Sequence, residues 1–210
     1  MKNIKERVLT SLILFFLIYL SLVNIIFLFS FLTLISFMAL SEFNIIFNRI
    51  YLKKKSLKFL SNLLSLIYVS IFVTSVWIYL SLGNNISKIS IFFILMICIS
   101  TDIGGYIFGK IIGGKKLTKI SPNKTYAGAI GSIVFSLIFG FLFLHIQNSI
   151  IISEINFIFI ILSVSILSQV GDLIISFLKR KAKIHDTGNI LPGHGGILDR
   201  IDGLLLAMPL

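Results

Sequence analysis

The chain has 210 residues, of which 57% are hydrophobic and 13% are charged, and its formal net charge is +11. Soluble domains carry about 25% charged residues, so this composition excludes an ordinary soluble fold and predicts a membrane protein. The basic residues stand in short clusters between apolar runs. That pattern is typical of loops beside anionic lipid head groups, so we expect a lipid bilayer, and no nucleic acid, as a partner.

The apolar runs predict the spanning helices. The run from Val8 to Leu40 is too long for one span of about 20 residues, and Ser21 and Asn24 offer a break. Because this run also exceeds the core of a signal peptide, it predicts a retained anchor. We expect six spans, at 8–22, 25–47, 59–81, 91–112, 125–147 and 156–178. The last apolar segment, 201–210, is too short to cross alone, so we predict an all-α polytopic transmembrane helical bundle of about six spanning helices plus a short C-terminal helix.

The distribution of charge predicts the orientation of these spans. The basic clusters lie at the N-terminus and at 48–58, 113–124 and 179–185. With six spans all of them fall on one side, whereas the opposite loops hold only Lys88 and Glu154. Because Lys and Arg are enriched in cytoplasmic loops, we expect the N-terminus and segment 186–203 to be cytoplasmic.

Acidic residues inside apolar runs are candidates for function, because an acid in a spanning helix costs a few kcal/mol. Asp102 and Asp172 each lie near the cytoplasmic end of a predicted span, with a glycine beside them. Each is either a functional acid or a helix-packing acid that pairs with a nearby Lys. Glu42 is placed closer to the interface, where the packing interpretation is favoured.

The loop SPNKTYAG, residues 121–128, starts the fifth predicted span. Lys124 and Thr125 stand at the expected helix N-terminus, where N–H groups, the helix dipole and a lysine can bind an anion. Simple capping by Ser121 or Asn123, with Lys124 as an interfacial anchor, explains the same pattern. Taken alone, the pattern favours capping.

The C-terminal segment LPGHGGILDRIDG, 191–203, is more specific. Asp199 and Asp202 are three residues apart, which on a helix places both carboxylates on one face, and such oxygen ligands suit Mg²⁺. Arg200 between them can neutralise phosphate oxygens. The glycines at 193, 195 and 196 surround His194 and allow the backbone to approach a bulky anion. A zinc site is excluded, because His185, His194 and Cys98 do not have the spacing of a Cys/His cluster.

The run from Ser176 to Asp202, S-x(2)-KR-x(4)-HD-x(5)-PGHGG-x(2)-DR-x-D, resembles the signature of the phosphatidate cytidylyltransferase (CDP-diglyceride synthase) family. The segments Asp102–Lys110 and Ser121–Thr125 also resemble that family, so the likeness covers about 91–203. It implies a bacterial inner-membrane nucleotidyltransferase of phospholipid biosynthesis that converts CTP and phosphatidate into CDP-diacylglycerol and pyrophosphate with Mg²⁺. We therefore expect N-terminal transmembrane helices over 1–90, a catalytic transmembrane region over 91–210 with a cytoplasmic-side active site, and a homodimer.

The resemblance also implies roles for single residues. The implied metal ligands are Asp172, Asp199 and Asp202. The implied phosphate-binding residues are Lys124, Lys179, Arg180 and Arg200. The residues implied to hold the nucleotide or the attacking phosphate are Ser121, Thr125 and His194, with Asp186, Gly195 and Gly196 as further substrate-binding positions. Asp102 is a less certain member of the site.

Two positions depart from the family pattern, and two other functions remain open. His185 stands where the family usually has Lys, and Ala127 where many members carry Glu. One alternative function is a CTP-dependent lipid kinase of the polyprenol or phytol type, which would release CDP instead of pyrophosphate. A remote alternative is a membrane transporter, which predicts polar residues spread across the bilayer rather than gathered at its cytoplasmic side.

Overall fold

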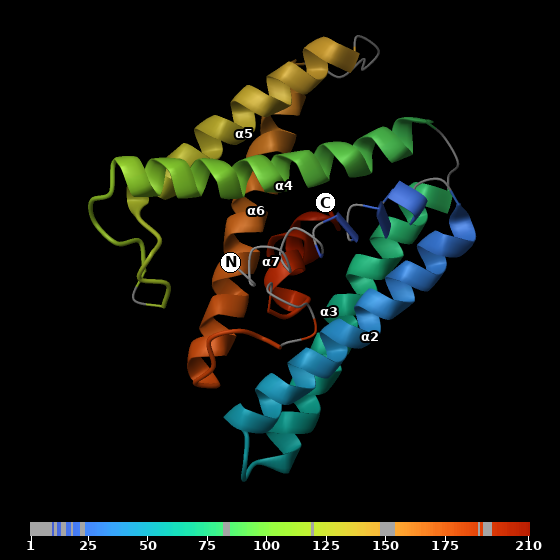
Figure 1. Cartoon of the computed structure of the whole chain (residues 1–210), viewed down its shortest axis with the longest axis vertical. Coiled ribbons are helices and arrows are strands. Elements are labelled where there is room, and N and C mark those ends of the chain that lie inside the picture. Colours follow the sequence, from blue (N-terminus) through green and yellow to red (C-terminus); the bar gives the residue numbers. More distant parts are fainter. Residues whose placement is uncertain are drawn as a thin grey trace. The chain divides into compact units, whose positions relative to one another are not determined.

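The computed structural model describes residues 24–81, 85–118, 120–147, 154–188, 190 and 195–210, together with Thr10, 12–13, 16–17 and 19–21. Its helices are α2 (Ile25–Ile50), α3 (Lys55–Ser81), α4 (Asn85–Ile111), α5 (Tyr126–Gln147), α6 (Glu154–Lys181) and α7 (Leu198–Ala207), as Figure 1 shows. Five of them, all except α7, are long and apolar enough to cross a membrane. The chain is therefore a multi-pass helical membrane protein, and the all-α prediction is confirmed.

The five long helices correspond to predicted spans two to six. Of the predicted span 8–22, the structure describes Thr10, 12–13, 16–17 and 19–21, which are helical, and the rest lies outside the described residues. Several helices extend beyond the apolar run that predicted them. For example, α3 begins at Lys55 rather than at residue 59, and α4 begins at Asn85 rather than at residue 91. A helix satisfies its own backbone hydrogen bonds, so it can continue through polar residues beyond the hydrocarbon region.

The chain divides into two compact units that do not follow the chain order. Unit 1 contains residues 1–81 and 178–201, and unit 2 contains 82–177 and 202–210. These units group residues by contact, whereas the predicted division into 1–90 and 91–210 concerns function and stays a prediction. The boundaries fall inside α6 and α7, so each of these two helices contributes residues to both units.

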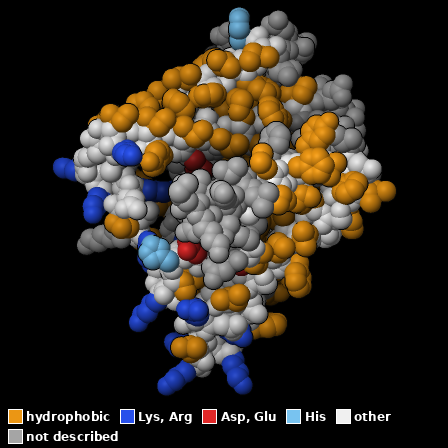
Figure 2. Space-filling view, in the orientation of Figure 1, with side chains coloured by type: hydrophobic (Ala, Val, Ile, Leu, Met, Phe, Trp, Pro, Cys, Tyr) orange, Lys and Arg blue, Asp and Glu red, His pale blue; other side chains and the backbone are white. Residues whose placement is uncertain are grey.

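In unit 1, α2 and α3 form an antiparallel hairpin closed by a short turn at residues 51–54. Asn24 caps α2, because its side chain accepts a hydrogen bond of 2.9 Å from the N–H of Ile26. Phe29 and Trp77 meet edge to face, with ring centroids 5.9 Å apart. Lys and Arg side chains gather around the turn of this hairpin (Figure 2), as expected for a loop at the membrane surface.

In unit 2, α4 and α5 pack closely because glycines face each other. A Cβ atom on Gly104 would lie 2.7 Å from the carbonyl oxygen of Gly131, so a side chain there does not fit. Ser132 of α5 donates a hydrogen bond of 2.7 Å to the carbonyl oxygen of Thr101 on α4. Small residues and interhelical hydrogen bonds of this kind hold helices together where lipid removes the hydrophobic driving force.

Candidate active site

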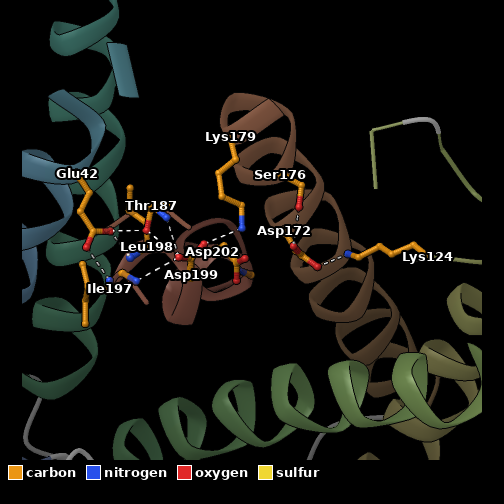
Figure 3. A network of polar contacts seen from close by, with 12 residues as sticks. Glu42, Lys124, Asp172, Ser176, Lys179, Thr187, Ile197, Leu198, Asp199 and Asp202 are labelled. Carbon is orange, nitrogen blue, oxygen red and sulfur yellow. Dashed lines mark hydrogen bonds and ion pairs between the residues drawn. The ribbon is translucent and has the colours of Figure 1, made fainter. Parts of the chain in front are cut away.

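The first polar cluster lies in unit 2, where α6 carries Asp172 and Ser176 one turn apart (Figure 3). Lys124 forms an ion pair with Asp172, and both side chains are partly buried. The hydroxyl of Ser176 donates a hydrogen bond of 3.2 Å to Asp172 Oδ1. Asp202 of α7 lies beside Asp172, so the cluster joins two carboxylates and one lysine.

The approach of α7 to α6 in unit 2 depends on small residues. A side chain at Gly171 would overlap the carbonyl oxygen of Asp202, and one at Gly203 would overlap the hydroxyl of Ser168. The N–H of Gly203 donates a hydrogen bond of 2.8 Å to Asp202 Oδ1. Burial, followed by the negative charge of Asp172, raises the pKa of Asp202 from 3.8 to about 8.

The loop that carries Lys124 is a short β-like turn. Lys116 and Thr125 form an antiparallel bridge, and the N–H of Lys124 donates to the carbonyl oxygen of Ser121 at 3.0 Å. Thr125 caps α5, because its hydroxyl accepts a hydrogen bond of 3.0 Å from the N–H of Gly128. The capping residue is thus Thr125, rather than the Ser121 or Asn123 that simple capping predicted. A substrate contact by Ser121 or Thr125 stays a prediction.

The second polar cluster lies in unit 1 and is centred on Asp199, which is close to the start of α7 (Figure 3). Lys179 Nζ lies 2.7 Å from Asp199 Oδ1. Asp199 Oδ2 accepts hydrogen bonds from the N–H of Thr187 at 2.9 Å and from the N–H of Gly196 at 3.2 Å. Burial alone would raise the pKa of Asp199, but Lys179 and the two N–H groups outweigh it and hold that pKa below its ordinary value of 3.8.

Glu42 of α2 joins the same cluster, although the sequence favoured a simple packing role for it. Its side chain is 0% exposed. The N–H groups of Ile197 and Leu198 donate to its two carboxylate oxygens at 2.9 and 3.0 Å, and the hydroxyl of Thr187 donates to it at 2.7 Å. We call Glu42, Thr187, Asp199 and the backbone of 196–198 the Glu42 clasp.

Neither Glu42 nor Thr187 was predicted from the sequence as a member of a polar cluster. Their partners lie between 12 and 156 residues away in the chain, so the separation hides most of these contacts. The one local signal is an acid within an otherwise apolar helix, which has to find hydrogen-bond donors when it is buried.

Of the remaining predicted site residues, the structure describes Arg180, Asp186, Gly195, Gly196 and Arg200. Gly195 has a φ of +84°, which glycine tolerates, and a Cβ there would lie 3.5 Å from Cβ of Asp186. At Gly196 the space for a side chain is occupied by Thr187 and Glu42. The side chains of Arg180, Asp186 and Arg200 are exposed, and His194 lies outside the described residues. Substrate binding by these residues stays a prediction.

The donor chemistry of the acids bears on the predicted metal site. Among the described residues, no group of three or more His, Cys, Asp or Glu side chains is arranged to hold a metal ion. Asp172 and Asp202 lie side by side in unit 2, and their oxygen donors suit a hard divalent cation. Asp199 belongs to unit 1, and both of its oxygens accept hydrogen bonds from the protein. The predicted ligand set of three aspartates therefore stays a prediction.

The chain is thus a multi-pass helical membrane protein in which Lys124 pairs with Asp172 and Lys179 pairs with Asp199. The model of the Cytidylyltransferase family matches residues 4–210, and the chain belongs to this family.

Curated relatives with this likeness are named phosphatidate cytidylyltransferase. The chain is 43% identical to the Bacillus subtilis (strain 168) protein over 130 residues, which are 60% of this chain and 48% of that protein. It is 39% identical to the Haemophilus influenzae protein over 121 residues, which are 56% of this chain and 42% of the relative. For the Rickettsia bellii protein the identity is 41% over 142 residues, 65% and 61% of the two chains. The chain thus spans about half the length of the relatives it matches.

Proposed function

We propose that the chain is a phosphatidate cytidylyltransferase, which converts CTP and phosphatidate into CDP-diacylglycerol and pyrophosphate. The observation that carries this proposal is the match of the family model to residues 4–210 together with the shared name of the relatives. The two polar clusters support it, because a reaction between two anionic substrates needs cations and metal ligands more than a covalent nucleophile.

In the proposed reaction, an oxygen of the phosphatidate phosphate attacks the α-phosphorus of CTP. The new P–O bond forms as the bond between the α-phosphorus and the bridging oxygen breaks, and pyrophosphate leaves with the electron pair. A phosphate monoester is largely ionised at neutral pH, so the attacking oxygen needs no general base. Lys124, Lys179, Arg180 and Arg200 are proposed to bind the phosphates and neutralise charge in the transition state.

Mg²⁺ is the proposed metal, and Asp172 and Asp202 are the residues whose placement fits it best. Their neighbouring carboxylates supply hard oxygen ligands, and Lys124 already brings one positive charge to Asp172. When bound, the ion would supply charge neutralisation at the phosphates. Asp199 is kept as a third ligand by the family resemblance alone.

The substrates support a site at the boundary between lipid and water. Phosphatidate lies in the leaflet and CTP in the cytosol, so we propose the bacterial cytoplasmic membrane as the location, with the N-terminus and the basic loops on the cytoplasmic side. Asp186, Gly195, Gly196, Ser121, Thr125 and His194 are proposed to contact the nucleotide or the lipid phosphate. A homodimer, and the absence of a nucleic-acid partner, stay predictions.

The test is to reconstitute the full chain in vesicles that contain phosphatidate, add CTP and Mg²⁺, and quantify CDP-diacylglycerol by mass spectrometry. Wild type is expected to form this lipid only with a divalent cation. Lys124→Ala and Asp172→Asn are each expected to lower the rate by at least about 100-fold, the scale of losing a charge-stabilising group. Lys55→Ala, which removes an exposed lysine of α3, is the matched control and retains the rate.

Absence of the lipid product with wild type would refute the proposed reaction. Full activity of Asp172→Asn would refute the assignment of the metal and phosphate site in unit 2, while leaving the reaction standing.

A further inference from the structure

The N-terminus of α7 has an unusual cap. Ile197 precedes the helix, and its carbonyl oxygen accepts hydrogen bonds from the N–H groups of Arg200 and Ile201 at 2.9 and 3.2 Å. Residues at this position usually carry a side-chain oxygen that binds the free N–H groups of the first turn, which isoleucine lacks. In unit 1 the missing acceptor comes from Glu42, which lies 155 residues earlier in the chain.

Described residues of the loop before α7 contact the same carboxylate, as Thr187 does in Figure 3. The hydroxyl of Thr187 lies 2.7 Å from Glu42 Oε2 and 3.0 Å from Asp199 Oδ2, so it connects the two acids. A Cβ atom on Gly188 would lie 2.7 Å from Glu42 Oε1, and one on Gly196 would lie 2.5 Å from Glu42 Oε2. Both glycines therefore bring the backbone against Glu42, and a side chain at either position would push it away.

We propose that Glu42 is a positioning residue, which holds the backbone at 187–188 and 196–198 so that α7 presents Asp199 and Arg200 in the geometry required for catalysis. The inference rests on the proposed function, and it assigns a catalytic contribution to α2, which carries none of the motif residues. Glu42 acts through Thr187 and the N–H groups of Ile197 and Leu198, and it touches no reacting atom. A buried carboxylate with three donors fixes its partners strongly, because breaking any of these bonds leaves a buried polar group unsatisfied.

The substitution Glu42→Gln separates positioning from packing. Glutamine has nearly the same shape, but its amide NH₂ replaces an oxygen that accepts a backbone N–H, so at least one bond of the clasp is lost. The matched control is Ile46→Ala, one turn further along α2, where the side chain is also 0% exposed. That variant weakens the packing of α2 without touching the clasp.

Two readouts are measured on the full chain in phosphatidate vesicles. Glu42→Gln is expected to lower kcat by at least about tenfold and to change KM for CTP by less than about twofold. The reason is that displacement of Asp199 and Arg200 destabilises the transition state more than the bound substrate. Hydrogen exchange of the peptide covering 186–201 is expected to become faster. Ile46→Ala is expected to lower the thermal midpoint while kcat of the folded protein and exchange of that peptide stay unchanged.

If the Glu42→Gln protein does not accumulate in cells, the variants Thr187→Val and Thr187→Ser test the positioning role instead. Serine keeps the hydroxyl and is expected to retain wild-type kcat, whereas valine, of nearly equal size, is expected to lose at least about tenfold. Wild-type kcat and unchanged exchange in Glu42→Gln or Thr187→Val would overturn the positioning role. A wild type that forms no CDP-diacylglycerol would instead refute the proposed function, and the exchange measurement would still report on the clasp.

Discussion

Asp199 and Asp202 are three residues apart on α7, yet their surroundings shift their pKa values in opposite directions. Asp199 receives hydrogen bonds from Lys179 and from two backbone N–H groups, so it stays ionised to a pH below 3.8. Asp202 is partly buried beside the negative charge of Asp172, which together raise its pKa to about 8. The ionised carboxylate of Asp199 therefore stabilises the fold through these hydrogen bonds. A bound cation would offset the negative charge of Asp172 and so stabilise the ionised form of Asp202.

The pKa of Asp199 predicts how stability depends on pH. A carboxyl whose folded-state pKa is lowered stabilises the fold above its ordinary value of 3.8, and this contribution is lost as the pH falls through the folded-state pKa. Asp199→Asn is thus expected to lower the stability at pH 7 by about 1–3 kcal/mol, the cost of leaving buried donors unsatisfied. The thermal midpoints of the two proteins should converge as the pH falls below about 4.

Circular dichroism of the detergent-solubilised proteins between pH 3 and 7 measures this convergence. A difference in midpoint that stays constant across the range, or that is absent at pH 7, contradicts the assigned role of the Asp199 carboxylate.

At the scale of the elements, the contact between α4 and α5 is a close backbone approach in unit 2. Gly104→Ala is expected to destabilise the protein by about 1–3 kcal/mol, because its Cβ would lie 2.7 Å from the backbone oxygen of Gly131, which has little room to move. The thermal midpoint of the purified variant measures the effect.

Gly109→Ala on the same helix is the matched control for this contact. Its Cβ would meet Thr125 Oγ1 at 3.5 Å, an ordinary contact, and alanine favours a helix over glycine by about 1 kcal/mol. That variant should be as stable as wild type or more so. Equal stability of Gly104→Ala and wild type would show that the two helices can move apart without cost.

The elements also show what sequence patterns can and cannot predict. Apolar runs of about 20 residues predicted five of the spans correctly, because length and hydrophobicity alone decide whether a helix can cross a bilayer. The helix ends were missed by several residues, since Lys55 and Asn85 are polar but still helical. The short α7 followed from the largely apolar segment 201–210, and its first residue, Leu198, lies three positions earlier than that segment.

At the scale of the whole molecule, the sequence identified Lys124, Asp172, Lys179 and Asp199 as candidate site residues, but not which of them pair. Lys124 meets Asp172 across 48 positions, and Glu42 meets Leu198 across 156. No periodicity or local motif encodes contacts at such separations, since they arise only when helices pack. For this reason the sequence favoured a packing role for Glu42 and did not predict its buried contacts with Ile197 and Leu198.

The central claim is that a cytidylyl group is transferred to phosphatidate, and the fate of each CTP phosphorus tests it most directly. Purified full chain is incubated with phosphatidate, Mg²⁺ and CTP that is labelled with ³²P at either the α or the γ position, and the lipid is extracted. We predict that α label enters the lipid and that γ label stays in water as pyrophosphate. Entry of γ label into lipid with release of CDP, as in a lipid kinase, or no label in lipid from either position, would contradict the account.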